Sequence, residues 1–375
     1  MIAEPAVGLR ALHSKRGWIG LGAAVLVMCG VVPALSLGTA VGSAFHVPDY
    51  LIALLGKFLC YGIVALAIDL IWGFTGILSL GHGVFFALGG YAMGMYLMLS
   101  IGAQGVYKSA LPDFMVFLDW HELPWFWHGF DNLSVALAAA LVVPGLLAFA
   151  FGYFAFRSRI RGVYFSIITQ ALTYALMLLF FRNETGFGGN NGLTDFKSIY
   201  GYDLHRPSTK VMLYVMSALA LLLSYLLCRY IVTSKAGRVL RAIRDAESRA
   251  MFVGFNPTNY KLFAWTLSAV LCGLAGALYV PQVGIINPGE MQPANSIEMA
   301  IWVAVGGRST LFGAVLGAFM VNGMRSFFTA AMPSAWLYVL GSLFIAVTLF
   351  FPDGFAGALG RLKLGRLGGL VRAKR

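Results

Sequence analysis

Apolar stretches of about 20 residues alternate with short polar or glycine-rich segments along most of the chain. A helix of that length crosses the hydrocarbon core of a bilayer, where an open strand would leave its backbone groups unsatisfied. The pattern therefore predicts membrane-spanning helices. The expected spans are 18–38, 51–72, 84–102, 133–156, 163–181, 211–231 and 261–281, followed by a more complex region at 292–351.

Lysines and arginines gather beside particular spans, and this distribution predicts orientation. The basic clusters lie before the first span, after the fourth, after the sixth and in the C-terminal tail, so we expect all four on the cytoplasmic side. Loop 103–132 carries mainly acids and is expected outside. The bases are Arg10, Lys15, Arg16, Arg157, Arg159, Arg161, Lys235, Arg238, Arg241, Arg244, Arg249, Arg361, Lys363, Arg366, Arg372, Lys374 and Arg375.

Two cytoplasmic termini require an even number of spans, and this decides the interpretation of the last region. We place 306–310 (GGRST) as a cytoplasmic turn. A short segment at 292–305 then enters, a span at 311–329 leaves and a span at 334–351 returns. The prediction is an all-α polytopic membrane protein with about ten transmembrane segments, one of them short or re-entrant, and such segments often line transport sites.

The expected organisation has three parts: a cytoplasmic N-terminus at 1–17, a transmembrane domain at 18–356 with a cytoplasmic loop at about 232–260, and a basic cytoplasmic tail at 357–375. The start also resembles a signal peptide, with bases, an apolar stretch and small residues at 38–40. Its apolar run is long for that purpose, so a retained first helix is the favoured interpretation.

Composition agrees with a membrane protein, because 59% of residues are hydrophobic and only 11% are charged. Soluble domains carry roughly 25% charged residues, so a soluble enzyme and a disordered chain are both excluded. The net charge of +12 is explained by membrane topology and does not indicate nucleic acid. No HExxH, GxSxG, phosphate-loop or paired-cysteine motif occurs, so we expect no catalytic centre, no metal, no cofactor and no ATP hydrolysis by this chain.

Polar groups inside the apolar regions are the candidates for contact with a transported molecule. The glycine-rich break at 73–83, with Thr75 and Ser79, predicts backbone that leaves the helix beside a cavity; close helix packing is the alternative. Glu298, three residues after Asn295, lies within the short segment and is the main candidate. Lys57 and Asp69 lie near opposite ends of their span, where they can reach the interfaces, and are expected to be structural.

The stretch at 234–259 has the pattern of a basic amphipathic helix. Its apolar positions recur at helical spacing, and Gly254 with Asn256-Pro257 is expected to end it. Two interpretations remain open from the pattern: a helix lying on anionic lipid, or a helix docking into a groove on a cytoplasmic partner. The apolar positions are Val239, Leu240, Ile243, Ala246 and Ala250.

Four short motifs in this order resemble the permease subunits of branched-chain amino-acid ABC importers, over about 56–355: GILSLGH at 76–82, GRVLRAIR at 237–244, the small-residue run 268–277 and VGG at 305–307. Residues 187–195 and 288–308 are more similar to the urea-type branch of that family.

The resemblance implies a bacterial inner-membrane importer with a second permease subunit, two cytoplasmic ATPases and a periplasmic substrate-binding protein. It implies that 234–259 contacts the ATPase and that the outer loops, especially 187–195, contact the binding protein. The implied ATPase-coupling residues are Gly237, Arg238, Leu240, Arg241, Ala242, Ile243, Arg244, Asp245, Glu247 and Gly254, and the implied binding-protein contacts are Asn190, Asn191 and Asp195.

For the substrate, the sequence favours urea or a short amide, because no paired opposite charges are evident at mid-membrane to hold an amino-acid zwitterion. Hydrogen-bonding groups for urea would come from Glu298, Asn295, Thr75, Ser79, Gln170 and Thr173. A branched-chain amino-acid permease is the alternative within the family. A stand-alone channel or ion-coupled carrier for a small neutral solute is the alternative outside it.

Overall fold

The computed structural model describes residues 12–357, apart from 41, 44, 161 and several positions between 336 and 356. It is helical nearly throughout, as predicted, and the chain is an all-α membrane protein. The α-helices are α1 (Lys15–Leu26), α2 (Val32–Gly38), α3 (Asp49–Ile68), α4 (His82–Leu99), α5 (Asp113–Phe117), α6 (Leu133–Arg157), α7 (Val163–Phe181), α8 (Pro207–Thr233), α9 (Lys235–Phe252), α10 (Pro257–Val283), α11 (Pro293–Gly306) and α12 (Phe312–Ala331).

Short elements join these helices. The turns of π- or 3₁₀-helix are η2 (Val27–Val31), η3 (Asp69–Gly73), η4 (Gly102–Gln104), η5 (Trp125–Trp127), η6 (Asn183–Thr185), η7 (Gly189–Asn191) and η8 (Pro288–Met291). Strand β1 (Leu193–Thr194) pairs with β4 (Ile285–Ile286), and β2 (Ser198–Ile199) pairs with β3 (Tyr202–Asp203), both antiparallel. The β1–β4 pair ties the loop after α7 to the loop after α10.

Seven helices in the described part of the chain are long and apolar enough to cross a membrane, and they coincide with the first seven predicted spans. The short segment and the outgoing span of the last region are present as α11 and α12. Much of the return span at 334–351, the start of the N-terminal segment 1–17 and nearly all of the tail 357–375 lie outside the described residues. The total of about ten segments and the position of the termini therefore stay predictions.

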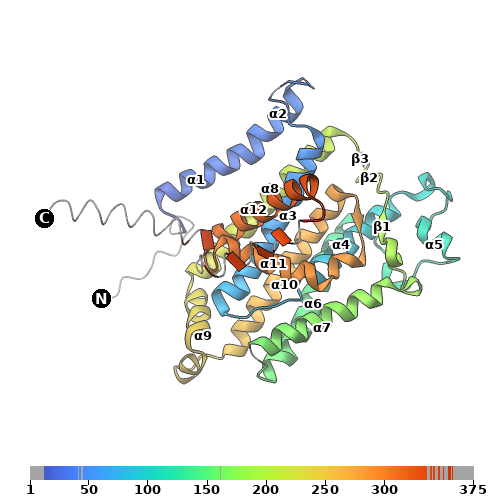
Figure 1. The fold of residues 1–375 in the computed structure, drawn as a ribbon. Coiled ribbons are helices and arrows are strands. Elements are labelled where there is room, and N and C mark those ends of the chain that lie inside the picture. The colour runs from blue at the N-terminus through green and yellow to red at the C-terminus, as the bar shows by residue number, and fades with distance from the viewer. Residues whose placement is uncertain are drawn as a thin grey trace.

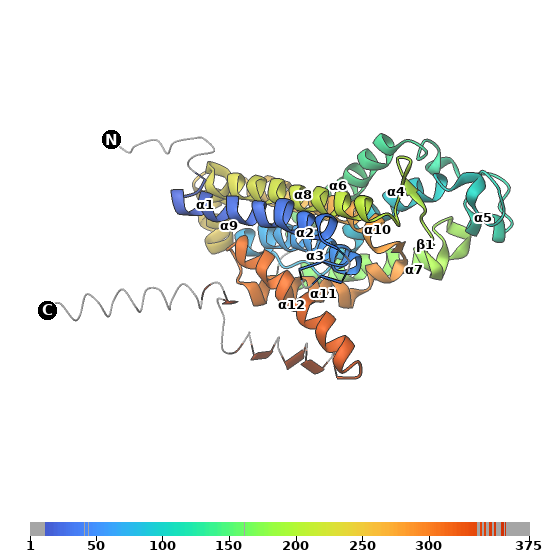
Figure 2. The ribbon, with the colours of Figure 1, turned by 90° about the horizontal axis from the view of Figure 1, so that it is seen from above.

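Helix α10 lies at the centre of the bundle and packs against α3, α4 and α6. Helix α4 is almost wholly buried by protein, whereas α1 is almost wholly uncovered and lies along one side of the bundle (Figure 1). Helix α9 lies at one end of the molecule, and α5 with β1, β2 and β3 lies at the other (Figures 1 and 2). The basic helix and the acidic loop 103–132 are thus at opposite ends, as expected for opposite sides of a membrane.

The turn after α11 lies at the same end as α9, because Arg244 Nη1 donates to Ser309 Oγ at 3.0 Å. Asp69, at the end of α3, accepts hydrogen bonds from Ser309 N at 2.7 Å and Leu311 N at 2.8 Å. Asp69 has no exposed surface. The expectation that it reaches the interface is therefore wrong: its carboxylate satisfies backbone amides of the turn.

Glycines let the central helices approach closely. A Cβ at Gly276 of α10 would lie 1.9 Å from the carbonyl oxygen of Phe86 in α4. A Cβ at Gly317 of α12 would lie 2.0 Å from the carbonyl oxygen of Trp302 in α11. Small residues at helix interfaces permit such contacts, and van der Waals packing is a main source of helix association in lipid.

We predict that Gly276→Ala lowers the free energy of unfolding by about 2 kcal/mol, because the added methyl group overpacks the α4–α10 contact. Thermal unfolding of the detergent-solubilised protein measures the change. Gly22→Ala in α1 is the matched control, since its Cβ would meet nothing within 4 Å. Equal unfolding midpoints for the two variants would contradict the packing argument.

Candidate functional site

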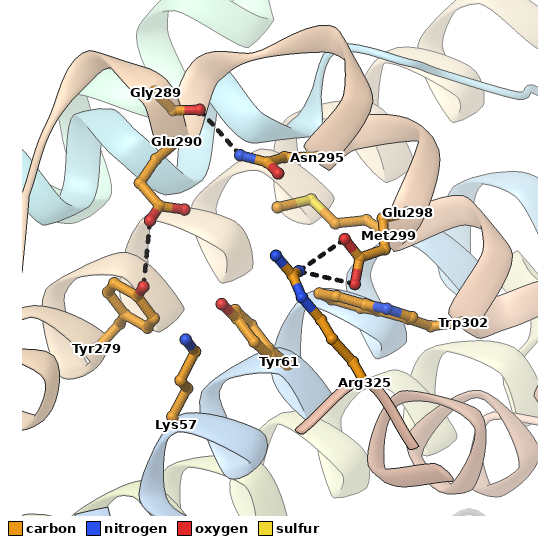
Figure 3. Close-up of a pocket in the computed structure, with 10 residues that line it drawn as sticks. All are labelled: Lys57, Tyr61, Tyr279, Gly289, Glu290, Asn295, Glu298, Met299, Trp302 and Arg325. Carbon is orange, nitrogen blue, oxygen red and sulfur yellow. Dashed lines mark hydrogen bonds and ion pairs between the residues drawn. The ribbon is translucent and has the colours of Figure 1, made fainter. Parts of the chain in front are cut away.

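A cavity of about 200 Å³ lies between α3, α10, α11 and α12 (Figure 3). Helix α3 contributes one wall, α10 and η8 a second, and α11 with α12 a third. The cavity is lined by Lys57, Tyr61, Tyr279, Gly289, Glu290, Asn295, Glu298, Met299, Trp302 and Arg325.

An ion pair occupies one side of this cavity. Arg325 Nη1 of α12 lies 3.0 Å and 2.7 Å from the two carboxylate oxygens of Glu298 in α11. Glu298 is 7% exposed, and the side chain of Arg325 is 44% exposed. A carboxylate at membrane depth needs such a partner, because an unpaired charge there costs at least ~2.5 kcal/mol.

This pair corrects the sequence argument about charge. We expected no opposite charges together within the membrane, yet Glu298 and Arg325 meet across two helices. The two residues are 27 positions apart, so no local spacing links them. The available signal was that Arg325 is a base near the end of the apolar stretch 311–329.

The opposite side of the cavity carries a second set of charged groups. Tyr279 donates its hydroxyl hydrogen to Glu290 Oε1 at 3.1 Å. Lys57 Nζ lies 5.6 Å from the ring centroid of Tyr61 and 5.7 Å from that of Tyr279, within cation–π range. Lys57 was expected to be structural and to reach an interface; instead its ammonium group lies in the cavity wall.

Neutral groups complete the lining. Asn295 Nδ2 donates to the carbonyl oxygen of Gly289 at 2.9 Å, which fixes the amide. The rings of Tyr61 and Trp302 form an apolar wall with centroids 4.7 Å apart. Trp302 Nε1 is one of several buried side-chain polar atoms in the described part of the chain that have no hydrogen-bond partner. The cavity therefore combines both signs of charge, an oriented amide and aromatic surface.

No residue of the glycine-rich break at 73–83 lines this cavity, and the polar groups of the break bond within the chain. Thr169 Oγ1 accepts from Leu80 N at 3.2 Å, and Ser296 Oγ accepts from Gly83 N at 3.1 Å. His82 is fully buried between Ser79 Oγ at 3.1 Å and Ser268 Oγ at 3.0 Å. Side chains of neighbouring helices thus satisfy the open backbone.

The sequence-predicted pathway residues fall into two groups. Glu298 and Asn295 line the cavity. The other four do not: Thr75 and Thr173 donate to helix carbonyls of Ile71 and Thr169, Ser79 bonds His82, and Gln170 is half-buried in α7. Their role in a pathway stays a prediction. The other lining residues were not among the predicted ones: Lys57, Tyr61, Tyr279, Gly289, Glu290, Met299, Trp302 and Arg325.

Helix α9 forms as the sequence predicts and ends before Gly254, with Asn256 capping α10. Its apolar stripe, however, is used within the chain. Val239, Ile243 and Ala250 are buried together and Tyr260 of α10 packs against them, while Leu240 lies in the main core. Part of the apolar stripe is therefore covered within the chain, while Val239, Ala246 and Ala250 also line a groove on the surface. Docking of the stripe on a partner stays a prediction.

A groove of about 700 Å³ runs along α9. It is lined by the stripe residues Val239, Ala246 and Ala250 and, beside them, by Lys235, Arg238, Ala242, Asp245, Arg249, Val253, Phe255 and Tyr260. The end of the helix exposes Phe252, which is 93% accessible. The backbone at Ala246 leaves the helical conformation (φ −158°, ψ 81°) and divides α9 into two parts.

The proposed contacts for a binding protein lie at the other end of the molecule. Asn190, Asn191 and Asp195 are exposed in the segment between α7 and α8 that β1 ties to β4. Across the described residues, no group of three or more histidines, cysteines or acids is arranged to hold a metal ion.

Comparison with known proteins gives the family. Residues 50–348 match the family described as the permease component of branched-chain amino acid transport systems. The chain belongs to this family. No solved structure matches the chain.

Individual members of the permease family are similar over most of the chain. The permease LivM of Salmonella typhimurium, from a high-affinity branched-chain amino acid transport system, is 25% identical over 316 residues, covering 78% of this chain and 67% of LivM. LivH of the same organism is 22% identical over 79% of this chain and 91% of its own length. The autoinducer 2 import permease LsrC of Yersinia pseudotuberculosis is 27% identical over 58% of this chain and 62% of LsrC.

We predict that removing Arg325 alone is more damaging than removing both members of its ion pair. Arg325→Met leaves Glu298 charged and buried, and we expect it to cost about 2 kcal/mol of stability. The double variant Glu298→Gln with Arg325→Met removes the stranded charge and should recover most of that loss. Thermal unfolding in detergent tests this, and a double variant less stable than Arg325→Met would contradict it.

Proposed function

We propose that this chain is a transmembrane permease subunit of an ATP-driven importer in the bacterial inner membrane. It forms half of the substrate pathway with a second permease, receives substrate from a periplasmic binding protein and is driven by two cytoplasmic ATPases. The observation that carries the proposal is the charged cavity between α3, α10, α11 and α12 in a chain of this permease family. The open face of α9 at one end supplies a surface for an ATPase.

For the substrate, the cavity favours a small zwitterionic amino acid. Lys57 and Arg325 offer two cations to a carboxylate, while Glu290 and Glu298 offer carboxylates to an ammonium group. Met299 and the aromatic rings supply the apolar surface that an aliphatic side chain requires. A volume of about 200 Å³ fits a molecule much smaller than a typical drug ligand. The relatives LivM and LivH are named as permeases of a high-affinity branched-chain amino acid transport system.

Urea is the second candidate. Its flat amide groups would find an acceptor in Glu298 and a donor in the unpartnered Trp302 Nε1. The residues at 187–195 and 288–308 support it through their similarity to the urea-type branch. A neutral molecule, however, leaves the four charged side chains of the cavity without a role, and this favours the amino acid.

We predict that cells in which this transporter is the sole importer accumulate labelled leucine and not labelled urea. Lys57→Met should reduce leucine uptake about tenfold, since it removes one charge-assisted contact to the carboxylate. Lys108→Met removes the same charge from an exposed loop and should leave uptake unchanged. Accumulation of urea in place of leucine would show that the urea-type assignment is correct.

The open face of α9 yields a separate prediction. Ala242 lines the groove and is exposed, so Ala242→Asp places a charge there without disturbing the core. We expect this variant to lose ATP-dependent uptake, because the partner ATPase no longer docks. Ile243 is unsuitable for the test, since it is buried and a charge there would unfold the helix.

Ser248→Asp is the control, because it adds the same charge at an exposed position of α9 outside the groove. Uptake in proteoliposomes with and without ATP is the measurement. Transport by Ala242→Asp that persists without ATP would point to a stand-alone channel or carrier.

A further inference from the structure

A polar cluster that is partly open to solvent joins α9 to the ends of two other elements. Arg244 Nη1 of α9 donates to the carbonyl oxygen of Gly73 at 2.8 Å and to Ser309 Oγ at 3.0 Å. Ser309 Oγ itself donates to the Gly73 carbonyl oxygen at 2.7 Å. The guanidinium of Arg244 therefore joins α9 to the end of η3 and to the turn between α11 and α12.

Asp69 secures the inner side of the same cluster. Its two carboxylate oxygens accept from the backbone amides of Ser309 and Leu311. These two residues have φ of 63° and 41°, the left-handed region that non-glycine residues rarely adopt. The turn thus keeps a strained conformation because Asp69 binds its amides.

The fit around Gly73 is tight. A Cβ there would lie 2.2 Å from Asp69 Oδ1 and 2.6 Å from Ser309 N. Beside it, Arg308 lies over the ring of Trp72, 4.9 Å from the centroid, which adds a second link between the turn and η3. The α3–η3 end and the α11–α12 turn therefore move as one unit.

Three of the helices that line the cavity, α3, α11 and α12, end at this cluster. Lys57 and Tyr61 belong to α3, Glu298 and Trp302 to α11, and Arg325 to α12. Lys57 and Asp69 are 12 residues apart in the α3–η3 helix, or about 18 Å along its axis. The cluster is thus at one end of the helices whose more distant parts hold the charged cavity groups.

Helix α9 is attached differently on the two sides of its kink. Before Ala246, Arg244 fastens it to the cluster. After Ala246, Glu247 pairs with Lys261 of α10 at 2.6 Å. The first part also packs against Tyr260 of α10 through Val239 and Ile243. The kink allows the two parts of α9 to change their angle to each other while the first part stays fastened to α3 and the turn.

We propose that Arg244 is a positioning residue that carries movement of α9 to α3, α11 and α12 and so couples ATP hydrolysis to opening of the cavity. This inference rests on the proposed importer function. Arg244 acts through Gly73 and Ser309 of its own chain, and the ATPase contact itself is left to the open groove around Ala242. The cluster transmits displacement because hydrogen bonds to a charged guanidinium are strong and directional.

The test uses the complete transporter, with both permeases, ATPases and binding protein, in proteoliposomes. Uptake of labelled leucine and ATP hydrolysis are measured together, and their ratio is the readout. For Arg244→Gln we expect ATP hydrolysis within about twofold of the unsubstituted complex and uptake per ATP lower by about tenfold. Arg157→Gln removes a charge from the end of α6, where Arg157 bonds Tyr153 of its own helix, and should leave the ratio unchanged.

Ser309→Ala provides an independent route, since it removes the shared hydroxyl while every charge stays in place. We expect it to lower the same ratio, and the double variant with Arg244→Gln should be no worse than Arg244→Gln alone, because both act through one cluster. A normal ratio in Ser309→Ala, or losses that add in the double variant, would overturn the inference. Absence of ATP-driven uptake of both leucine and urea in the unsubstituted complex would instead overturn the proposed function.

Discussion

Lipid offers no hydrogen bonds to a protein backbone, and the two interrupted segments of this chain are built around that constraint. Between α3 and α4 the amides of Leu80 and Gly83 are satisfied by Thr169 and Ser296 from other helices. At the α11–α12 turn the amides of Ser309 and Leu311 are satisfied by Asp69. At each break, the backbone amides that are not bonded within a helix bond to side chains of other helices. Each break therefore connects helices that are distant in the chain.

The same constraint governs charge. Two groups of charged side chains in the described bundle concern the proposed function: the cavity, with Lys57, Glu290, Glu298 and Arg325, and the cluster around Asp69 and Arg244. In the cavity Glu298 and Arg325 lie close enough to bind each other. The zwitterionic substrate proposed above would exchange partners with that pair, so that neither charge would be left unpaired.

For helix α9 the sequence predicted the helix correctly but did not show what its apolar residues contact. Its amphipathic pattern located the helix and its end at Gly254, and the structure agrees. The pattern could not say what covers the apolar stripe, because burial against Tyr260 of the same chain and burial in a partner require the same residues. The groove left for a partner includes Val239, Ala246 and Ala250 of the stripe together with Ala242 and two arginines, and Phe252 is exposed at the end of the helix.

The sequence by itself determined the membrane class, seven spans, the short α11 and the turn at 306–310, since apolar length and backbone satisfaction are local properties. It also identified Glu298 and Asn295 as candidates for substrate contact, and both line the cavity. Only the tertiary structure decided that Arg325 reaches Glu298, that Lys57 faces a cavity and that Arg244 joins Gly73 to Ser309. Those contacts link helices far apart in the chain, and helix packing, which hydropathy does not encode, sets which faces meet.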